Sequence, residues 1–403
     1  MPYTDDTCDL TPEQTLLKQE AHRFAAEVLR PTAAALDDLR PDEVIAADSP
    51  LWDAFRKAYR AGHHLRAFPP ELGGAGLGLF DSHLIGEEFG WGNSGLSISL
   101  SVTSMPFRFA AMSGHPDLMR EIVMPFVEDT EGRFVGCWGA TEPNHGSDLI
   151  MGGNDPKVHL DCTARRDGDE WVIDGQKSSW VSNGTIATHT LAFLNVQPEL
   201  GMMGTGIAVI PLNLPGVTKG PPLNKLGQRP LNQGEIFFDS VRIPAHYMLV
   251  EPPHAMAGIE TILAGANAGM STTFSGVARA AFEEALTYTQ SRIQGGVPLS
   301  SHQLVQKRLF DMFMRVQASR ALSRKANLRL ASGLPTAHYS MAAKVFATRT
   351  AFDVASDASE LFGGMGMVKG VLVEALMRDA RASLIEDGAN DTLSITAARL
   401  LLG

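Results

Sequence analysis

The chain has 403 residues, of which 44% are hydrophobic and 20% charged, and its formal net charge at pH 7 is −11. This length predicts two or three structural units, and the negative charge argues against nucleic acid as a partner, because phosphates are repelled unless a basic patch overrides it. No run of eighteen apolar residues occurs, so we expect no membrane-spanning helix.

Cysteine and histidine usage argues against two further classes of protein. Cys8, Cys137 and Cys162 are too few and too scattered for a disulfide framework. The start of the chain, Met1–Asp6, is acidic where a secretory signal would be basic and then apolar, so we expect a cytoplasmic protein. The twelve histidines show no zinc-ligand spacing, and no metal site is expected.

Residues 1–132 are predicted to form a helical domain. Thr11 is followed by Pro12 and, three positions on, by Gln14, which is the pattern of a capped helix start. The apolar residues after it recur at helical spacing. Proline and glycine residues between 69 and 78 interrupt this pattern, and a second helix is expected over residues 82–90.

Residues 133–250 carry the signals of a β domain. Asp167-Gly168 suits a turn with positive φ between two short apolar runs, which predicts a hairpin. Further apolar runs lie at residues 191–196, 206–210 and 235–238. Because no helix-length pattern separates them, we expect an antiparallel barrel or sandwich rather than alternating strands and helices.

Helical periodicity returns over residues 251–403. Its long helices with apolar faces predict a bundle that also mediates oligomerisation. The expected fold class is therefore α+β, with three domains in the order helical, β and helical.

Two segments of the central region combine residues suited to holding a planar polar ring. Gly139–Asp148 offers short hydroxyls and backbone N–H groups, although the same composition is typical of an ordinary turn. Trp180 and Ser182 are two positions apart, so in a strand both would point to one face; the alternative is a core tryptophan. No serine-hydrolase elbow, phosphate loop or Rossmann fingerprint occurs.

The C-terminal region adds two candidates for ligand binding. Arg292 could bind a pyrophosphate through two guanidinium nitrogens, or it could be a solvated helix residue. Phe362-Gly363-Gly364 could let a helix end approach a ligand closely, or it could be an ordinary helix stop.

Taken together in order, spacing and residue type, these segments resemble the acyl-CoA dehydrogenase family over almost the whole chain. The motifs that carry the resemblance are Thr141-Glu142-Pro143 with Gly146-Ser147-Asp148, Trp180 to Gly184, Leu226 to Arg229 with Phe238 to Pro244, Arg292 to Gln303, Phe362 to Gly366, and Arg378 to Arg381. One such motif is weak evidence, but six in this order make coincidence a poor explanation.

The resemblance implies a homotetramer whose C-terminal domain is a four-helix bundle, with FAD bound between that bundle and the β domain. By position, FAD contacts are implied for Trp138, Ala140, Thr141, Ser147, Trp180, Ser182, Arg292, His302, Gln303, Glu360, Gly363, Gly364 and Asp391. Three positions depart from the family pattern: Gly295 replaces an aromatic residue, Glu360 a glutamine and Ala389 a threonine.

The resemblance also implies a reaction in which a carboxylate removes the α-proton of a thioester while a hydride leaves the β-carbon for the flavin. Ungapped alignment from Arg378 places Asp387, followed by Gly388, where most members have glutamate. Aspartate reaches about 1–1.5 Å less far, and a displacement of about 1 Å can cost about a hundredfold in rate. The alternative is that Asp387 only turns the chain and Glu386 is the base.

The implied substrate is an acyl-CoA, and the implied electron acceptor is an electron-transfer flavoprotein. Substrate contacts are implied for Ser147, Asn267 and Gly388, and Asn267 stands where many members have arginine. The hydroxyl-rich stretch Ser97, Ser99, Ser101, Ser104 aligns with the family's acyl-pocket helix, which favours a short, branched or alicyclic acyl group. Two alternatives are a flavin monooxygenase, desulfinase or reductase relative without a carboxylate base, and a non-enzymatic scaffold of the same fold.

Overall fold

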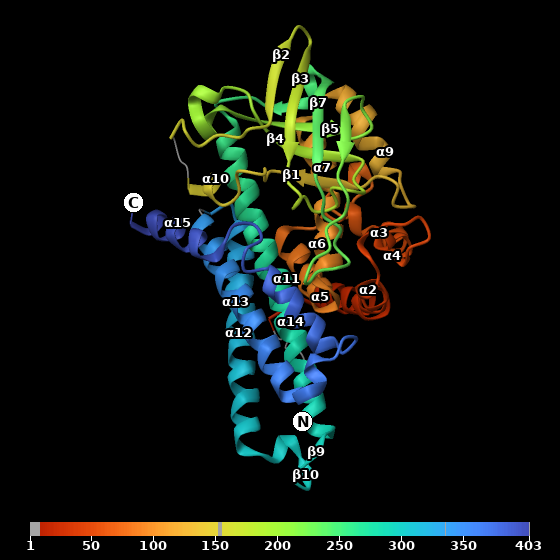
Figure 1. The fold of residues 1–403 in the computed structure, drawn as a ribbon, viewed down its shortest axis with the longest axis vertical. Coiled ribbons are helices and arrows are strands. Elements are labelled where there is room, and N and C mark those ends of the chain that lie inside the picture. The colour runs from red at the N-terminus through yellow and green to blue at the C-terminus, as the bar shows by residue number, and fades with distance from the viewer. Residues whose placement is uncertain (1–8, 152–154, 335, 403) are drawn as a thin grey trace.

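The computed structural model describes residues 9–151, 155–334 and 336–402, so Cys8 lies outside the described residues. A helical region, a β region and a second helical region follow one another along the chain, as expected for the α+β class. The β sheet forms one end of the molecule, and the long helices of the last region run away from it (Figure 1).

The first region is helical, and its start is capped as predicted. The Thr11 side chain accepts a hydrogen bond from Gln14 N at 3.2 Å, and Thr11 N donates to Gln14 Oε1 at 3.2 Å. The helix expected over residues 82–90 is longer, because it begins directly after Gly78 and continues past Gly90 to Gly92. The α-helices of this region are α1 (Pro12–Phe24), α2 (Arg30–Asp37), α3 (Pro41–Val44), α4 (Pro50–Arg60), α5 (Leu79–Gly92), α6 (Ser94–Thr103), α7 (Met105–Ser113), α8 (Pro116–Leu118) and α9 (Met124–Val127).

The β region is one sheet with strand order β6-β7-β3-β2-β4-β5-β8, and β1 pairs with β4. Its strands are β1 (Gly136–Gly139), β2 (Thr163–Asp167), β3 (Glu170–Lys177), β4 (His189–Asn195), β5 (Thr205–Pro211), β6 (Val217–Lys219), β7 (Ile236–Pro244) and β8 (Met248–Val250). The predicted hairpin is confirmed as β2–β3, with Gly168 at φ +62°.

The sheet differs from the antiparallel expectation at its centre. β4 runs parallel to both β1 and β2, so the sheet is mixed. All residues of β4 are buried, which is typical of a strand covered on both faces. The short helix α10 (Asp148–Met151) lies between β1 and β2 in the chain.

The last region is a helical bundle that continues the core of the other two. It consists of α11 (Ala255–Ser291), α12 (Gln303–Ala331), α13 (Ala337–Phe362), α14 (Leu372–Ala382) and α15 (Asn390–Leu402), with the hairpin β9 (Ile293–Gln294) and β10 (Val297–Pro298) between α11 and α12. Fully buried alanines such as Ala281 on α11 and Ala351 on α13 let these two helices pack closely. Helix α11 also packs against α5.

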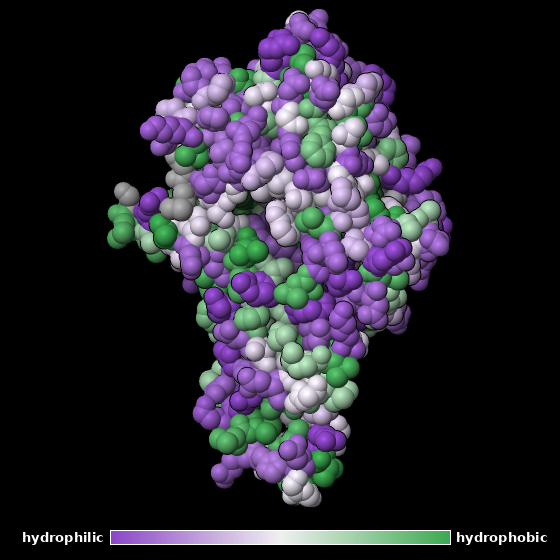
Figure 2. Space-filling model, viewed as in Figure 1, coloured by the Kyte–Doolittle hydropathy of each residue, from purple (hydrophilic) through white to green (hydrophobic). Residues whose placement is uncertain are grey.

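Large apolar side chains remain exposed on this last region. Leu304 and Phe310 of α12 are 83% and 59% exposed, and Leu402 at the end of α15 is 88% exposed. Figure 2 shows hydrophobic residues interspersed with polar ones over the part of the molecule that the long helices form. Within the described ranges, every helix is too short or too polar to cross a membrane.

Candidate active site

The loop between α14 and α15 holds Asp387 in an unusual backbone conformation. Asp387 has φ +49° and Gly388 has φ +98°. Aspartate tolerates the left-handed region better than most residues, and Gly388 is needed because a Cβ there would lie 2.8 Å from Ile150 Cδ1. The loop therefore presents Asp387 in one defined orientation.

A hydrogen bond joins this loop to the β region. Ala389 N donates to Ser147 Oγ at 3.0 Å, although the two residues are 242 positions apart in the chain. Ser147 belongs to the Gly139–Asp148 segment, so the structure brings the predicted ring-binding loop and the candidate base into contact. Ser147 and Gly388, both predicted to contact the substrate, flank this junction.

The two adjacent carboxylates, Glu386 and Asp387, differ in their partners. Glu386 accepts a hydrogen bond from Gln228 Nε2 at 3.0 Å, and burial raises the pKa of Glu386 to about 7 against the opposing effect of Lys225. Burial also raises the pKa of Asp387, and the Lys344 ammonium opposes this. Within the described ranges the Asp387 carboxylate makes no hydrogen bond, so it remains available to a ligand.

The Gly139–Asp148 segment is anchored through Glu142. This buried carboxylate pairs with Lys177 Nζ at 2.6 Å and accepts a hydrogen bond from Cys162 N at 3.1 Å. Thr141 O accepts from Ser178 N at 2.9 Å, while the partly exposed Thr141 hydroxyl has no hydrogen-bond partner among the described residues. The loop is thus anchored to the β region through Glu142 and the Thr141 carbonyl, and the Thr141 hydroxyl stays partly exposed.

Trp180 lies in a turn after β3 and Ser182 forms an isolated antiparallel bridge with Gln233, so the two residues do not form a continuous strand as expected. The turn requires Asn183 at φ +63°, which a strand cannot accommodate. Ser182 Oγ accepts a hydrogen bond from Gln233 Nε2 at 3.3 Å. Trp180 is 57% exposed, so the alternative of a core tryptophan is also wrong.

Asn183 is the hydrogen-bond partner of Ser99, one of the serines in the stretch that aligns with the family's acyl-pocket helix. Ser99 Oγ donates to Asn183 Oδ1 at 2.6 Å, and Asn183 Nδ2 donates to Ser99 O at 2.9 Å. Ser101 Oγ donates to Ile98 O of its own helix and is exposed. Ser99 thus supports the Trp180 turn, and the hydroxyl-rich stretch is not a uniform pocket lining.

Four other predicted contacts lie on or beside β1, α11 and α15. Trp138 of β1 packs edge-to-face on Phe193, and its Nε1 is buried without a hydrogen-bond partner in the described part of the chain. Asn267 of α11 is fully buried, its Nδ2 donates to Leu263 O, and its Oδ1 likewise lacks a partner there. Ala140 is half-buried after β1, and Asp391 is exposed in the first turn of α15.

The remaining predicted FAD contacts lie at the far end of the bundle. These exposed residues are Arg292, His302, Gln303, Glu360, Gly363 and Gly364. His302 Nε2 pairs with Gln294 O at 3.0 Å, and Glu360 accepts from Arg308 Nη1 at 2.6 Å. The β9–β10 hairpin directly follows Arg292 in the chain, and Figure 1 shows this hairpin at the opposite end of the long helices from the sheet. One chain therefore does not bring the two predicted sets together.

Sequence reasoning missed the residues that support the candidate base from behind. Gln228, at φ +49°, donates to Glu386, the Lys225 charge opposes the rise in the pKa of Glu386, and Lys344 donates to Gly388 O at 2.8 Å. Gln228 lies in the Leu226 to Arg229 motif and Lys225 directly precedes it, but this motif indicates only the family and not a role for either side chain. No neighbouring residue indicates a role for Lys344, because the apolar residues around it are typical of an ordinary helix.

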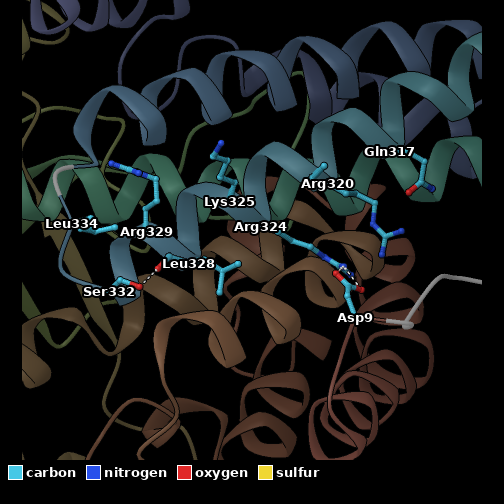
Figure 3. A pocket seen from close by; sticks show the side chains of 10 residues that line it. Asp9, Gln317, Arg320, Arg324, Lys325, Leu328, Arg329, Ser332 and Leu334 are labelled. Atoms are coloured by element: carbon cyan, nitrogen blue, oxygen red, sulfur yellow. Dashed lines mark hydrogen bonds and ion pairs between the residues drawn. The ribbon is translucent and has the colours of Figure 1, made fainter.

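A separate cavity of about 610 Å³ opens beside α12. Figure 3 shows Arg324 turned toward Asp9, and the Arg324 Nη1 to Asp9 Oδ2 distance is 2.8 Å. Arg320, Lys325 and Arg329 add positive charge to the lining. Asp9, the carboxylate among its described lining residues, is paired with an arginine, so this cavity offers no free base.

Tertiary contacts bring together one histidine and aspartate group that sequence spacing could not reveal. His115, Asp117 and His246 place possible ligand atoms within 4.8 Å of one another. The two imidazoles, however, are stacked 4.5 Å apart with an interplanar angle of 9°. Parallel stacked rings cannot both direct an in-plane lone pair at one ion, so the arrangement seen does not form a metal site.

Family profiles match each region of the chain. The N-terminal domain of acyl-CoA dehydrogenase matches residues 11–128, its middle domain residues 137–241, and its C-terminal domain residues 258–402. Among similar proteins, a probable acyl-CoA dehydrogenase (YngJ) of Bacillus subtilis is 30% identical, covering 98% of this chain and 99% of the relative.

Two further relatives extend the comparison. Cyclohex-1-ene-1-carbonyl-CoA dehydrogenase of Geobacter metallireducens is 30% identical over 98% of this chain and 99% of its own. The solved structure of butyryl-CoA dehydrogenase from Megasphaera elsdenii is 27% identical and superposes with a TM-score of 0.86, covering 99% of this chain and 100% of that one.

Proposed function

The chain belongs to the acyl-CoA dehydrogenase family, and we propose that it is FAD-dependent and oxidises a CoA thioester with a short, branched or alicyclic acyl group, using Asp387 as the base. The observation that carries the proposal is the hydrogen bond from Ala389 N to Ser147 Oγ at 3.0 Å. This bond joins the segment that carries Asp387, whose carboxylate makes no hydrogen bond in the described part of the chain, to the loop suited to a flavin ring.

The residues near this junction fit the ring of FAD. The exposed Trp180 offers an aromatic face, and the Thr141 hydroxyl, which has no partner within the described ranges, offers a hydrogen-bonding group. Trp138 Nε1 is a buried donor without a described partner, which is the kind of group that a ligand satisfies. When bound, FAD would supply the acceptor for a hydride.

The carboxylate partners favour Asp387 over Glu386 as the base. Glu386 is held by Gln228 Nε2, so it would have to break this bond to reach a substrate. Asp387 has no such bond to any described residue, and its loop is already ordered by Ser147 and Lys344. A general base must combine access with a fixed position, since misplacement is costly in rate.

The choice of acyl group rests on Asn267 and on the relatives. Asn267 puts a neutral amide, whose buried Oδ1 has no partner among the described residues, where many members have a guanidinium. One relative is named for an alicyclic thioester and another for butyryl-CoA. Ser99 no longer contributes to this choice, because its hydroxyl is bonded to Asn183.

The distribution of the FAD contacts supports an oligomer, which we propose is a homotetramer. The β9–β10 hairpin, which lies between Arg292 and Gln303 in the chain, is at the opposite end of the long helices from the sheet (Figure 1), so these two residues would hold the adenine half of a FAD whose ring lies on another subunit. Exposed Leu304 and Phe310 close to Gln303 are typical of a surface covered in an assembly.

The proposal is tested by purifying the protein, recording its absorption spectrum and adding CoA thioesters under anaerobic conditions. We expect a yellow protein whose flavin is bleached by short, branched or alicyclic acyl-CoA and reoxidised by an electron-transfer flavoprotein. A colourless protein that cannot be reconstituted with FAD contradicts the proposal. A yellow protein that reacts only with oxygen after chemical reduction favours a monooxygenase.

A further inference from the structure

A lysine is buried directly behind the loop that carries Asp387. Lys344 lies on α13 with 0% of its surface exposed. Its Nζ donates to the carbonyl oxygen of Gly388 at 2.8 Å and to Asn390 Oδ1 at 2.8 Å. A lysine is almost never fully buried unless its charge is balanced, so this position needs a balancing group.

Acidic groups that face Lys344 come from the loop itself. Burial lowers the pKa of Lys344 to about 8, while the charges of Asp387 and Glu386 oppose that effect. Glu386 also accepts a hydrogen bond from Gln228 and faces the charge of Lys225, and both of these residues belong to the β region. Asp387 has no hydrogen-bond donor among the described residues, so the Lys344 ammonium is the positive charge that opposes its burial.

The same lysine also holds the backbone of the loop. Asp387 at φ +49° is in the left-handed region, which residues with a side chain seldom adopt, so other contacts help to maintain it. Lys344 fixes the carbonyl of the next residue, Gly388. One turn further along α13, Thr348 Oγ1 accepts from Asn390 Nδ2 at 3.0 Å. Helix α13 thus holds the loop on the C-terminal side of Asp387.

We propose that Lys344 is a positioning residue for the base: it fixes the Asp387 loop and keeps the carboxylate ionised so that it can accept the α-proton. The inference rests on the proposed role of Asp387. In the step itself the α-proton moves to Asp387, and Lys344 keeps its proton throughout. Without the ammonium, a desolvated carboxylate would hold a proton to a higher pH and fewer molecules would carry a competent base.

The test compares Lys344→Met with the parent holoenzyme in the pH dependence of kcat/KM. Methionine keeps an apolar side chain of similar length without the charge. We expect the acid limb to move up by about one pH unit or more, kcat to fall about tenfold, and KM to change little, because Lys344 does not touch substrate. Lys344→Arg, which keeps the charge, should leave the acid limb close to its parent position.

A matched control is Lys57→Met, which removes an exposed lysine paired with Asp53 on α4 and should not move the acid limb. An unmoved acid limb in Lys344→Met overturns the inference. If that variant does not fold, Lys344→Gln replaces it with the same expectation. If neither variant folds, Thr348→Val is measured, because it removes the other contact between α13 and Asn390. We expect a lower kcat, and an unchanged kcat overturns the inference.

Failure of the inference and failure of the proposed function have different signatures. If Asp387→Asn keeps the parent rate, the proposed base is wrong whatever Lys344 does. If Asp387→Asn is inactive but yellow and Lys344→Met has the parent profile and kcat, only the role of Lys344 is wrong.

Discussion

Replacing Glu142 by glutamine tests how the loop beside the candidate flavin site is held. The side chains of Glu142 and Lys177 are both 0% exposed and form an ion pair at 2.6 Å. Water therefore cannot solvate either charge if its partner is removed. Glutamine keeps an oxygen for Cys162 N but leaves the Lys177 ammonium without its counter-charge. Breaking a buried pair in this way costs roughly 3–5 kcal/mol. At about 2–4 °C per kcal/mol, the melting temperature should fall by about 6–20 °C.

The assay is thermal unfolding followed by circular dichroism and by release of flavin fluorescence. The double variant Glu142→Gln/Lys177→Met should recover most of the loss, since replacing both members of a buried pair is often neutral. Glu131→Gln, which affects an exposed pair with Arg60, should change stability by less than about 1 kcal/mol. A Glu142→Gln melting temperature equal to that of the parent, or a double variant no better than the single one, would refute the reasoning.

Three further results are expected. Asp387→Glu should lower kcat by about one to two orders of magnitude in steady-state assays, because the extra methylene displaces the carboxylate and glutamate tolerates φ +49° poorly; an undiminished kcat contradicts this. The kcat/KM of the parent should fall as pH drops through the pKa of Asp387, which burial raises, since the protonated acid cannot accept a proton; a profile flat to about pH 4 would disagree. Arg292→Ala and Asp387→Asn subunits, each inactive alone, should give active oligomers when co-expressed, and absence of recovery would argue against FAD sites shared between subunits.

Features set by neighbouring residues were predictable from the sequence. The capped start at Thr11 and the hairpin turn at Gly168 each depend on a few consecutive residues, and both are confirmed. The three-region order follows from hydrophobic periodicity, which is also a local property. The parallel pairing of β4 with β1 and β2 was not predictable, because it joins segments separated by long connections.

In the candidate site too, the residues found from the sequence depend on local spacing, and the residues missed depend on contacts between distant segments. Asp387 could be found because it follows a recognisable stretch at fixed spacing, and Thr141 and Ser147 for the same reason. Lys344 is 43 positions from Asp387 on another helix, and only folding makes it a partner of Gly388. The strand expected at Trp180 failed because alternation cannot reveal that Asn183, bonded to Ser99, turns the chain.

The most direct test of the central claim is anaerobic stopped-flow bleaching of the flavin in two matched variants, Asp387→Asn and Glu386→Gln, with the thioester that the parent oxidises fastest. If Asp387 is the base, Asp387→Asn stays yellow and binds the thioester but is not bleached, while Glu386→Gln is bleached at a measurable rate. Bleaching of Asp387→Asn at the parent rate, with Glu386→Gln inert, would contradict the assignment and identify Glu386 as the base.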